Sequence, residues 1–318
     1  MKINSLGYYL PEKIQTSADL ASKINKSEHW ITSRTGIYER RISNIDVDEM
    51  AAIAAAKAIG DGLPPDLILN ASGVPKQTIP DTSTFIQSKL GYEGIPSFTI
   101  HSTCLSFLVA LKTASNFIQN SDYKRILIVS SDRGSRGRNF EEPESAALLG
   151  DAAAAILLKP SENNKNGLIH WNMNTWPKGA SFTEVRGGGT HKHPQDPNTT
   201  RADNLFSMNG PKIYKMARKY VYDMINQDLK KVGIDKSEIK LVIPHQASGL
   251  AVKAYIKYGG FKTEQVINII SYTGNCVAAS IPLALAIAHE QGKIKRGDLI
   301  YFIGTGAGLS VASVLIKY

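Results

Sequence analysis

The feature that most constrains the fold of this chain is a regular alternation of short apolar runs with longer segments of helical spacing. The apolar runs have the length of buried strands and lie at 66–71, 125–130, 153–158, 240–244, 299–303 and 309–316. The helical segments lie at 47–59, 84–90, 105–119, 210–232 and 277–290. Such an alternation is typical of a layered α/β protein, in which helices cover the faces of sheets.

The alternation runs twice along the chain, and its two halves end alike. Residues 150–158 read GDAAAAILL and residues 306–316 read GAGLSVASVLI, which indicates a weak internal duplication. Residues 171–203 are rich in Gly, Pro, Thr, Asn and His and predict an irregular connection. A chain of 318 residues can bury two packed halves. We place the boundary near residue 165, between an N-terminal half 1–165 and a C-terminal half 166–318.

Composition and charge narrow the class of protein. Hydrophobic residues make up 42% of the chain and charged residues 20%, which indicates a compact globular protein rather than a disordered one. The longest uncharged apolar run, 277–288, is shorter than the about 20 residues that a membrane span needs, and the first residues lack a signal-peptide profile. We therefore expect a cytoplasmic protein without a membrane partner.

The net charge of +9 would suit a nucleic-acid partner, because cationic surfaces bind phosphates. However, the sequence has no arginine-rich tail, zinc finger or helix-turn-helix signature that would concentrate this charge. An acidic protein partner or a phosphate-bearing carrier fits the charge equally well. We expect no nucleic-acid partner.

One of the two cysteines lies where a nucleophile could be activated. Cys104 and Cys276 form neither a disulfide framework nor a CxxC metal motif. Cys104 stands between an extended stretch, 96–103, and a helical stretch, 105–118, so it lies at the start of a helix. The positive end of a helix dipole favours thiolate over thiol. Taken alone, this window also fits a buried and inert cysteine.

Two further polar residues occupy positions where active sites collect. His245 directly follows the strand-like run 241–244, and the ends of such strands line ligand sites in α/β sheets. Asn275 lies in a Gly-Asn turn that opens a helix near residue 277. Taken singly, a structural histidine and a helix-capping asparagine are the plainer interpretations. His191 and His193 have no third ligand nearby, so we treat them as loop residues and expect no metal.

Together these windows resemble β-ketoacyl-ACP synthase III over nearly the whole chain. The order is Cys104, then PHQAS at 244–248, then GNCVAASIPLAL at 274–285. The other matching phrases are WITSRTGIYER at 30–40, IQSKLGYEGIPSFTIHSTC at 86–104, MNGPKIYK at 208–215 and GTGAGLSVASVLIKY at 304–318. The resemblance implies the thiolase fold, which has two duplicated α/β halves in a five-layer αβαβα arrangement, and a homodimer.

The resemblance also implies a reaction and its residues. Cys104 would hold an acyl primer as a thioester, and His245 and Asn275 would drive a decarboxylative Claisen condensation with malonyl-ACP. The backbone N–H groups of Cys104 and Ala307 would form the oxyanion hole. The primer would arrive as acyl-CoA or acyl-ACP, and the product would serve fatty acid or polyketide-type biosynthesis. The reaction needs no cofactor.

The implied binding residues include several departures from the family. The residues assigned to substrate binding are Trp30, Arg34, Ile79, Gly210 and Ser248. Leu250 replaces an arginine that holds the pantetheine donor, and residues 142–149 lack the arginine that faces Trp30 across the adenine of CoA. Ile79 replaces a bulky aromatic that closes the acyl pocket, which predicts a longer or branched primer.

The predicted helix 210–232 and the next one carry a basic patch, which we define as Lys212, Lys215, Lys253 and Lys257. Residues three or four apart share a helix face, so the basic patch could dock an acidic acyl carrier protein. A solvated face without a partner is the alternative. Two other functions stay open, a non-condensing acyltransferase and a non-catalytic partner subunit. Asn275 argues against the first function and Cys104 against the second.

Overall fold

The computed structural model describes residues 1–161 and 167–318 of the chain. Its principal strands are β1 (Lys2–Tyr9), β4 (Leu67–Asn70), β5 (Ser97–Thr99), β6 (Ile126–Arg133), β7 (Asp151–Lys159), β8 (Gly167–Thr175), β11 (Ile239–Pro244), β12 (Leu299–Gly306) and β13 (Ser310–Lys317). Its longer helices are α2 (Glu28–Thr35), α3 (Val47–Ile59), α4 (Thr82–Lys89), α5 (Ser106–Gln119), α7 (Gly210–Val232), α8 (Gly249–Lys257) and α10 (Ser280–Glu290). The smaller elements are α1 (Ser17–Ala21), α6 (Pro143–Ala146), α9 (Ile270–Thr273), β2 (Ile14–Thr16), β3 (Glu39–Arg41), β9 (Thr183–Glu184) and β10 (Ser207–Met208).

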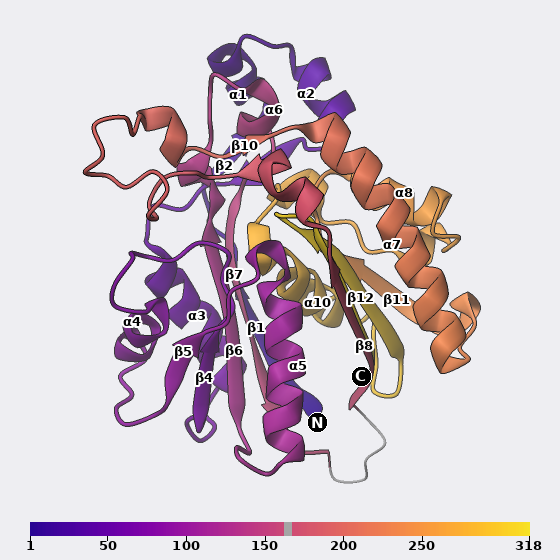
Figure 1. The fold of residues 1–318 in the computed structure, drawn as a ribbon. Helices are drawn as coiled ribbons and strands as arrows, with labels where there is room; N and C mark the ends of the chain where they lie inside the picture. The colour runs from indigo at the N-terminus through magenta and orange to yellow at the C-terminus, as the bar shows by residue number, and fades with distance from the viewer. Residues whose placement is uncertain (162–166) are drawn as a thin grey trace.

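Two sheets repeat one arrangement of strands (Figure 1). In the first sheet the order is β1-β7-β6-β4-β5, with β4 parallel to β5 and β6, and β7 antiparallel to β6 and β1. In the second the order is β8-β13-β12-β11, with β12 parallel to β11 and β13 antiparallel to its neighbours. The two phrases that indicated a duplication form β7 and β13, which occupy equivalent places. The boundary expected at residue 165 lies within 162–166, outside the described residues.

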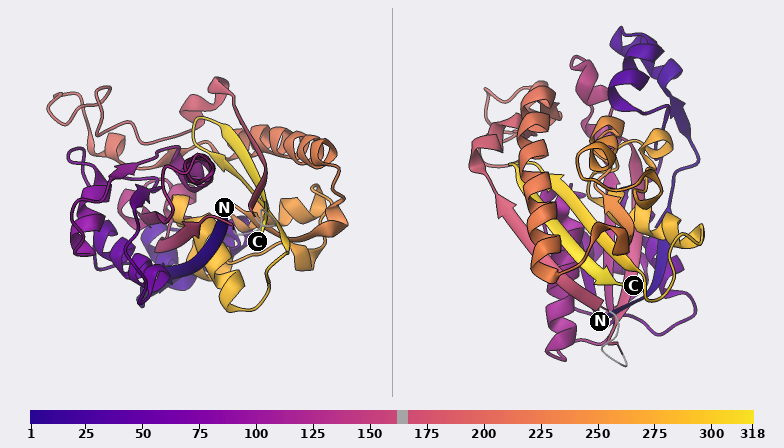
Figure 2. Two further views of the ribbon diagram at one scale, coloured as in Figure 1. Left: turned by 90° about the horizontal axis from the view of Figure 1, so that it is seen from below. Right: turned by 90° about the vertical axis from the view of Figure 1, so that its right-hand side faces the viewer.

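Alternating side chains along the strands create five layers. In β4, Leu67 and Leu69 pack against the central helices, while Ile68 packs on the opposite face against α3. In β12, Phe302 faces the central helices and Tyr301 faces the layer of α7 and α8. The central layer consists of α5 and α10, as the view from below also shows (Figure 2). Because both faces of these strands are buried, their sequences are continuously apolar, which confirms the predicted α/β layering.

The central helices explain two of the apolar segments in the sequence. Every residue of α10 from Ser280 to Ala288 is buried, because the helix lies between the two sheets. Each central helix is preceded by one turn of 3-10 helix, which spans Thr103–Leu105 before α5 and Val277–Ala279 before α10. The helix predicted at 277–290 therefore begins as a 3-10 turn and becomes an α-helix at Ser280.

The outer edge strands depart from the sequence-based expectation. Residues 171–175, predicted as irregular, belong to β8, which pairs with β13 along its length. An edge strand keeps every second side chain near solvent, so its sequence contains polar residues such as Asn172 and Asn174. The strand therefore does not form the continuous apolar run by which the central strands were recognised. The strand β1 at the edge of the first sheet escaped prediction for the same reason. Residues 176–206 do form a largely irregular connection, with short 3-10 turns and the two-residue strand β9.

The longest helix, α7, is amphipathic. Its apolar side chains Val221, Ile225 and Leu229 are buried against the second sheet, while most of its lysines are exposed. Within residues 1–161 and 167–318, no helix is both long and apolar enough to cross a membrane.

Candidate active site

Cys104 lies in the 3-10 turn that leads into α5, at the junction of the two halves. The turn packs against β12 of the second sheet and against the matching turn Val277–Ala279. Thr103, just before the cysteine, has a left-handed φ of 51°. The Cys104 side chain is half-buried. The sequence placed Cys104 at a strand-to-helix junction, and the structure has it there.

His245 approaches the cysteine turn across a glycine. It directly follows β11, and its N–H donates to the carbonyl of Ile303 in β12 at 2.9 Å. A Cβ placed on Gly304 would lie 2.9 Å from His245 Cβ and 3.2 Å from Leu105 Cδ2. Since only glycine leaves room there, His245 and the residue after Cys104 pack on the same point of β12. His245 is 4% exposed.

Asn275 is fixed by its backbone and by its side chain. Its N–H donates to the carbonyl of Leu148 at 2.9 Å, and its carbonyl accepts from the N–H of Gly150 at 3.0 Å. Its Oδ1 accepts from the N–H of Val277 at 2.9 Å. Its Nδ2 donates to the carbonyl of Ala247 at 3.4 Å. An amide group has two N–H donors, so one of them is left for a ligand.

Asn275 and His245 are joined to each other through Ala247. The N–H of Ala247 donates to the His245 carbonyl at 2.9 Å, while its own carbonyl accepts from Asn275. The structure therefore brings Cys104, His245 and Asn275 together from three separate segments. His245 and Asn275 come from the C-terminal half, and Cys104 comes from the N-terminal half.

The electrostatics of Cys104 oppose the expectation of a favoured thiolate. Burial, with a smaller contribution from the negative charge of Asp132, raises the pKa of the Cys104 thiol to about 12. A backbone hydrogen bond to the sulfur opposes this rise without cancelling it. The prediction was wrong for the resting protein, because moving a thiolate out of water outweighs the partial positive charge at a helix start.

His245 is neutral over the physiological range. Burial lowers the pKa of its imidazole to about 4. Among the described residues, its buried Nδ1 has no hydrogen-bond partner. A neutral imidazole carries one N–H donor and one acceptor, so His245 can donate a single ring hydrogen bond.

Ala307 directly follows the end of β12, where that strand meets the cysteine turn. A Cβ on Gly306 would lie 2.6 Å from Thr103 Oγ1. The backbone around Gly306 is therefore in close contact with the turn that carries Cys104. This places the predicted second oxyanion donor, Ala307, one residue from that contact.

The predicted substrate-binding residues other than Ile79 lie on or near α2. The Arg34 guanidinium lies 5.0 Å from the centre of the Trp30 ring, and its Nη1 lies 3.4 Å from Glu144 Oε1. A Cβ on Gly210 would lie 3.3 Å from Glu144 Oε2, so Gly210 borders the same place. Ser248 accepts from the N–H of Ala251 at 3.1 Å and caps α8.

A hollow of about 230 Å³ opens beside α2 and the start of α8. Gly36 and Gly249 touch at its base, where a Cβ on either residue would lie 2.8 Å from the other Cα. Leu250 lines the hollow and is 49% exposed. Its lining is His29, Thr32, Ser33, Gly36, Tyr38, Gly249, Leu250 and Lys253.

The other predicted residues lie on the surface. Ile79 is 80% exposed, so it lines no buried pocket of its own chain. The basic patch spans α7 and α8, which pack together because Tyr222 of α7 donates to the carbonyl of Ala254 at 3.0 Å. Arg218 of α7 also lies 5.3 Å from the ring centre of Tyr258, which follows α8.

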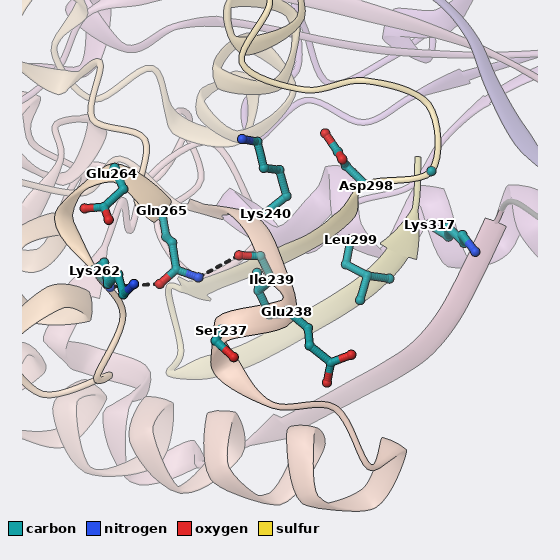
Figure 3. A pocket seen from close by; sticks show the side chains of 11 residues that line it. Ser237, Glu238, Ile239, Lys240, Lys262, Glu264, Gln265, Asp298, Leu299 and Lys317 are labelled. Carbon is teal, nitrogen blue, oxygen red and sulfur yellow. Dashed lines mark hydrogen bonds between the residues drawn. The ribbon is translucent and has the colours of Figure 1, made fainter.

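A larger hollow, of about 600 Å³, lies away from this site (Figure 3). It is formed where β11 and β12 begin, whereas His245 and Gly306 lie where those strands end. Both lysines and carboxylates line it. Gln265 donates there to the carbonyl of Ile239 and accepts from the N–H of Lys262. In residues 1–161 and 167–318, no group of three His, Cys, Asp or Glu side chains could hold a metal ion.

Sequence reasoning missed one functional-site neighbour, Asp132. This residue lies near the end of β6 and is fully buried, and its hydrogen-bond donors among the described residues are four backbone N–H groups. Burial raises its pKa to about 7. The available signal was an aspartate at the end of the apolar run ILIVSSD, where a charge needs a specific partner.

A doubled five-layer α/β fold, with a cysteine before one central helix and an asparagine before the other, defines a condensing enzyme of the thiolase class. Residues 98–177 match the family model of 3-oxoacyl-[acyl-carrier-protein (ACP)] synthase III, and residues 229–318 match that of its C-terminal part. The β-ketoacyl-[acyl-carrier-protein] synthase III of Natranaerobius thermophilus is 34% identical over 326 residues, covering 100% of this chain and 99% of that protein. The chain belongs to the β-ketoacyl-ACP synthase III family and is a condensing ketosynthase, an acyltransferase.

Solved structures agree with the fold. The crystal structure of 3-oxoacyl-[acyl-carrier-protein] synthase III from Aquifex aeolicus superposes with a TM-score of 0.91 at 32% identity, over 100% of this chain and 99% of that one. The priming β-ketosynthase of the R1128 polyketide pathway also gives a TM-score of 0.91, at 23% identity, over 99% of this chain and 95% of that one, and shares the fold. The predicted thiolase fold is confirmed.

Proposed function

We propose that this ketosynthase joins an acyl primer to a malonyl unit by decarboxylative Claisen condensation, with Cys104 as nucleophile. The observation that carries the proposal is that Cys104, His245 and Asn275 come together from three separate segments. Gly304 lets His245 reach the cysteine turn, and Asn275 is joined to His245 through Ala247. A thiol beside two neutral hydrogen-bond donors suits an acyl transfer followed by formation of an enolate.

In the first step the sulfur of Cys104 attacks the thioester carbon of the primer. The bond between that carbon and the carrier sulfur breaks, and the carrier leaves as a thiol that has gained the proton of Cys104. The N–H groups of Cys104 and Ala307 stabilise the oxyanion between these events. The acyl group is then held as a thioester on Cys104.

In the second step the malonyl thioester loses its carboxylate as carbon dioxide. The electron pair of the broken bond forms an enolate, whose oxygen accepts hydrogen bonds from Asn275 Nδ2 and from the neutral ring of His245. The enolate carbon attacks the acyl thioester, and Cys104 leaves as a thiolate. A β-ketoacyl thioester results, and the pKa of about 4 for His245 keeps the donor ring in its neutral form.

The malonyl unit would arrive on an acyl carrier protein. The names of the relatives state this carrier, and the basic patch of α7 and α8 would suit such an acidic partner. The hollow beside α8, which Lys253 of the basic patch also lines, would admit the pantetheine arm. Since the carrier protein is a cytoplasmic partner, the enzyme would work in the cytoplasm.

We infer that the primer also arrives on the carrier protein rather than on CoA. Glu144 pairs with Arg34, the cation that would otherwise face the phosphates of CoA. Glu142 lies close by, and its Oε1 accepts from Ser207 Oγ at 3.0 Å. The carboxylate of Glu144 beside Arg34, with Glu142 two residues before it, disfavours a polyphosphate ligand by like-charge repulsion.

A homodimer would complete the acyl pocket. The strand β5 lies at the edge of the first sheet, where Phe98 is partly exposed. Val74 and Ile79 in the loop after β4 are also exposed, which gives this edge apolar side chains for a second copy. Ile79 would then close the pocket of the partner, and its small side chain would admit a longer or branched primer.

The proposal is tested by intact-protein mass spectrometry after incubation with acyl-ACPs and acyl-CoAs of graded chain length. We expect one acyl adduct on the native chain, absent from Cys104→Ala, with a preference for acyl-ACP. The buried Cys276 is the matched control, since Cys276→Ala should keep the adduct. An adduct that persists in Cys104→Ala would overturn the assignment of the nucleophile.

A further inference from the structure

Asp132 accepts hydrogen bonds from two segments of the active site and so links them. Its side chain is fully buried at the end of β6. Its Oδ1 accepts from the N–H groups of Gly73 and Val74, both at 2.9 Å. Its Oδ2 accepts from the N–H groups of Ala278 and Ala279, at 3.1 and 3.2 Å. One carboxylate therefore links a loop of the N-terminal half to the start of α10 in the C-terminal half.

The turns before the two central helices are equivalent. Each begins with a residue in the left-handed region, Thr103 with a φ of 51° and Val277 with a φ of 50°. The N–H before each turn donates to a serine four residues on, from Ser102 to Ser106 Oγ at 2.9 Å and from Cys276 to Ser280 Oγ at 3.1 Å. By this correspondence the nucleophile Cys104 and Ala278 occupy equivalent positions.

The two equivalent turns use their free N–H groups differently. At the first turn, the N–H of Cys104 belongs to the proposed oxyanion hole. At the second turn, the N–H groups of Ala278 and Ala279 both donate to Oδ2 of Asp132. Oδ2 of Asp132 thus accepts at the second turn in the way that the oxyanion of the reaction would accept at the first. Two hydrogen bonds thereby anchor the second turn to β6.

This carboxylate is connected to both sides of the site. Val277 directly precedes the pair that Asp132 holds, and its N–H fixes Asn275 Oδ1 at 2.9 Å. A Cβ on Gly73 would lie 2.5 Å from Val277 Cγ1, so the first loop packs directly on the second turn. The carbonyl of Gly73 accepts from His101 Nε2 at 3.1 Å, three residues before Cys104.

We propose that Asp132 is a positioning residue of the condensation step, which holds the Val277–Ala279 turn and through it Asn275 in place beside Cys104. The inference rests on the proposed function of Asn275 as a donor to the enolate. It concerns the second step only, since the first step uses Cys104 and the oxyanion N–H groups.

The variant that tests this role is Asp132→Asn, which keeps the shape of the side chain. An asparagine has one acceptor oxygen and one NH₂ group, so two of the four backbone N–H groups would face a donor. Either the 73–74 loop or the 278–279 turn must then shift. The charge of Asp132 raises the pKa of the Cys104 thiol, so its removal should not slow acylation.

Asp228→Asn is the matched control. Asp228 is also a buried carboxylate with four hydrogen-bond donors, but it lies between α7 and the outer face of the second sheet. Its donors are His170, Asn172, Tyr301 and Ser313. The substitution removes a comparable buried network without touching Cys104, His245 or Asn275.

The measurement separates the two steps in single-turnover experiments. Acylation of Cys104 is followed by mass spectrometry, and the isolated acyl-enzyme is then mixed with malonyl-ACP and the product followed in time. We expect Asp132→Asn to slow condensation at least tenfold more than acylation. Asp228→Asn should change both steps by the same factor. Equal factors for both steps in Asp132→Asn would overturn the proposal.

A second variant covers the case in which Asp132→Asn does not fold. Ala279 has a φ of −67°, which is the value that a proline ring imposes. Ala279→Pro deletes one of the four donors and leaves the carboxylate intact, so condensation should again fall more than acylation. If the native chain is acylated and condenses, and the variants slow both steps by the same factor, only the inference about Asp132 is contradicted. A native chain that never condenses contradicts the proposed function and this inference with it.

Discussion

The side-chain oxygen of Asn275 accepts a hydrogen bond of 2.9 Å from the backbone N–H of Val277. This contact fixes the rotation of the amide group, so that its NH₂ group points toward Ala247 and the site. Asn275 therefore has two separable parts, an acceptor that holds the turn and a donor that is proposed to act on substrate.

Asn275→Asp should separate these two parts. An aspartate keeps the acceptor for Val277 and removes both N–H donors, the one to the carbonyl of Ala247 and the one proposed for the substrate. Neither donor takes part in the proposed first step, so the acylation of Cys104 should survive. Condensation should fall about a hundredfold or more, as is typical when one donor to a developing oxyanion is lost. Single-turnover condensation of the acylated variant measures this, with circular dichroism as the check on folding. A loss below tenfold would contradict the proposed role.

The thiol of Cys104 should become more reactive throughout the accessible alkaline range. With a pKa raised to about 12, the thiolate fraction grows about tenfold for each pH unit below that value. Alkylation by iodoacetamide, measured between pH 6 and 9.5 and compared with Cys104→Ala, should rise without levelling. A plateau below pH 8 would show instead that the helix start outweighs burial.

The buried neutral His245 should make the protein sensitive to acid. Its folded pKa of about 4 lies below the usual 6.5, so the unfolded chain binds more protons between these values and stability falls as the pH falls through them. Between pH 7 and pH 5 this amounts to about 2 kcal/mol in the free energy of unfolding. Urea titrations of the native chain and of His245→Gln should differ by this amount in their pH dependence. Parallel pH dependences would contradict the burial of a neutral imidazole.

The ion pair of Arg34 with Glu144 should bias the choice of primer carrier. Replacing Glu144 by glutamine frees the arginine, so acylation by acyl-CoA should increase several-fold relative to acyl-ACP. The pair is partly exposed, so little change in stability is expected. Glu141→Gln, which alters an exposed carboxylate on the same segment, is the control. An unchanged ratio in Glu144→Gln would remove the support for a carrier-bound primer.

Much of the fold could be predicted because its central strands are buried on both faces. Such strands form continuous apolar runs, and β4, β6, β7, β11, β12 and β13 were all recognised in this way. The edge strands β1 and β8 were not, because half of their side chains are polar. The pairing of β8 with β13 is a long-range contact that no local pattern indicates.

The site was predictable in its positions but not in its electrostatics. Cys104, His245 and Asn275 each lie at the end of a strand or turn, and such boundaries between elements can be recognised in the sequence. The raised pKa of Cys104 depends on burial and on Asp132, a residue 28 positions away, which the local sequence does not show. Asp132 escaped notice because its partners are backbone N–H groups, which every residue except proline carries.

The most direct test of the account mixes the isolated acyl-enzyme with malonyl-ACP and measures the products. We expect the adduct on Cys104 to disappear while β-ketoacyl-ACP and carbon dioxide form in amounts equal to the adduct lost. An acyl-enzyme that malonyl-ACP leaves intact, while a hydroxyl or amine acceptor discharges it, would contradict the account and indicate an acyltransferase without condensation.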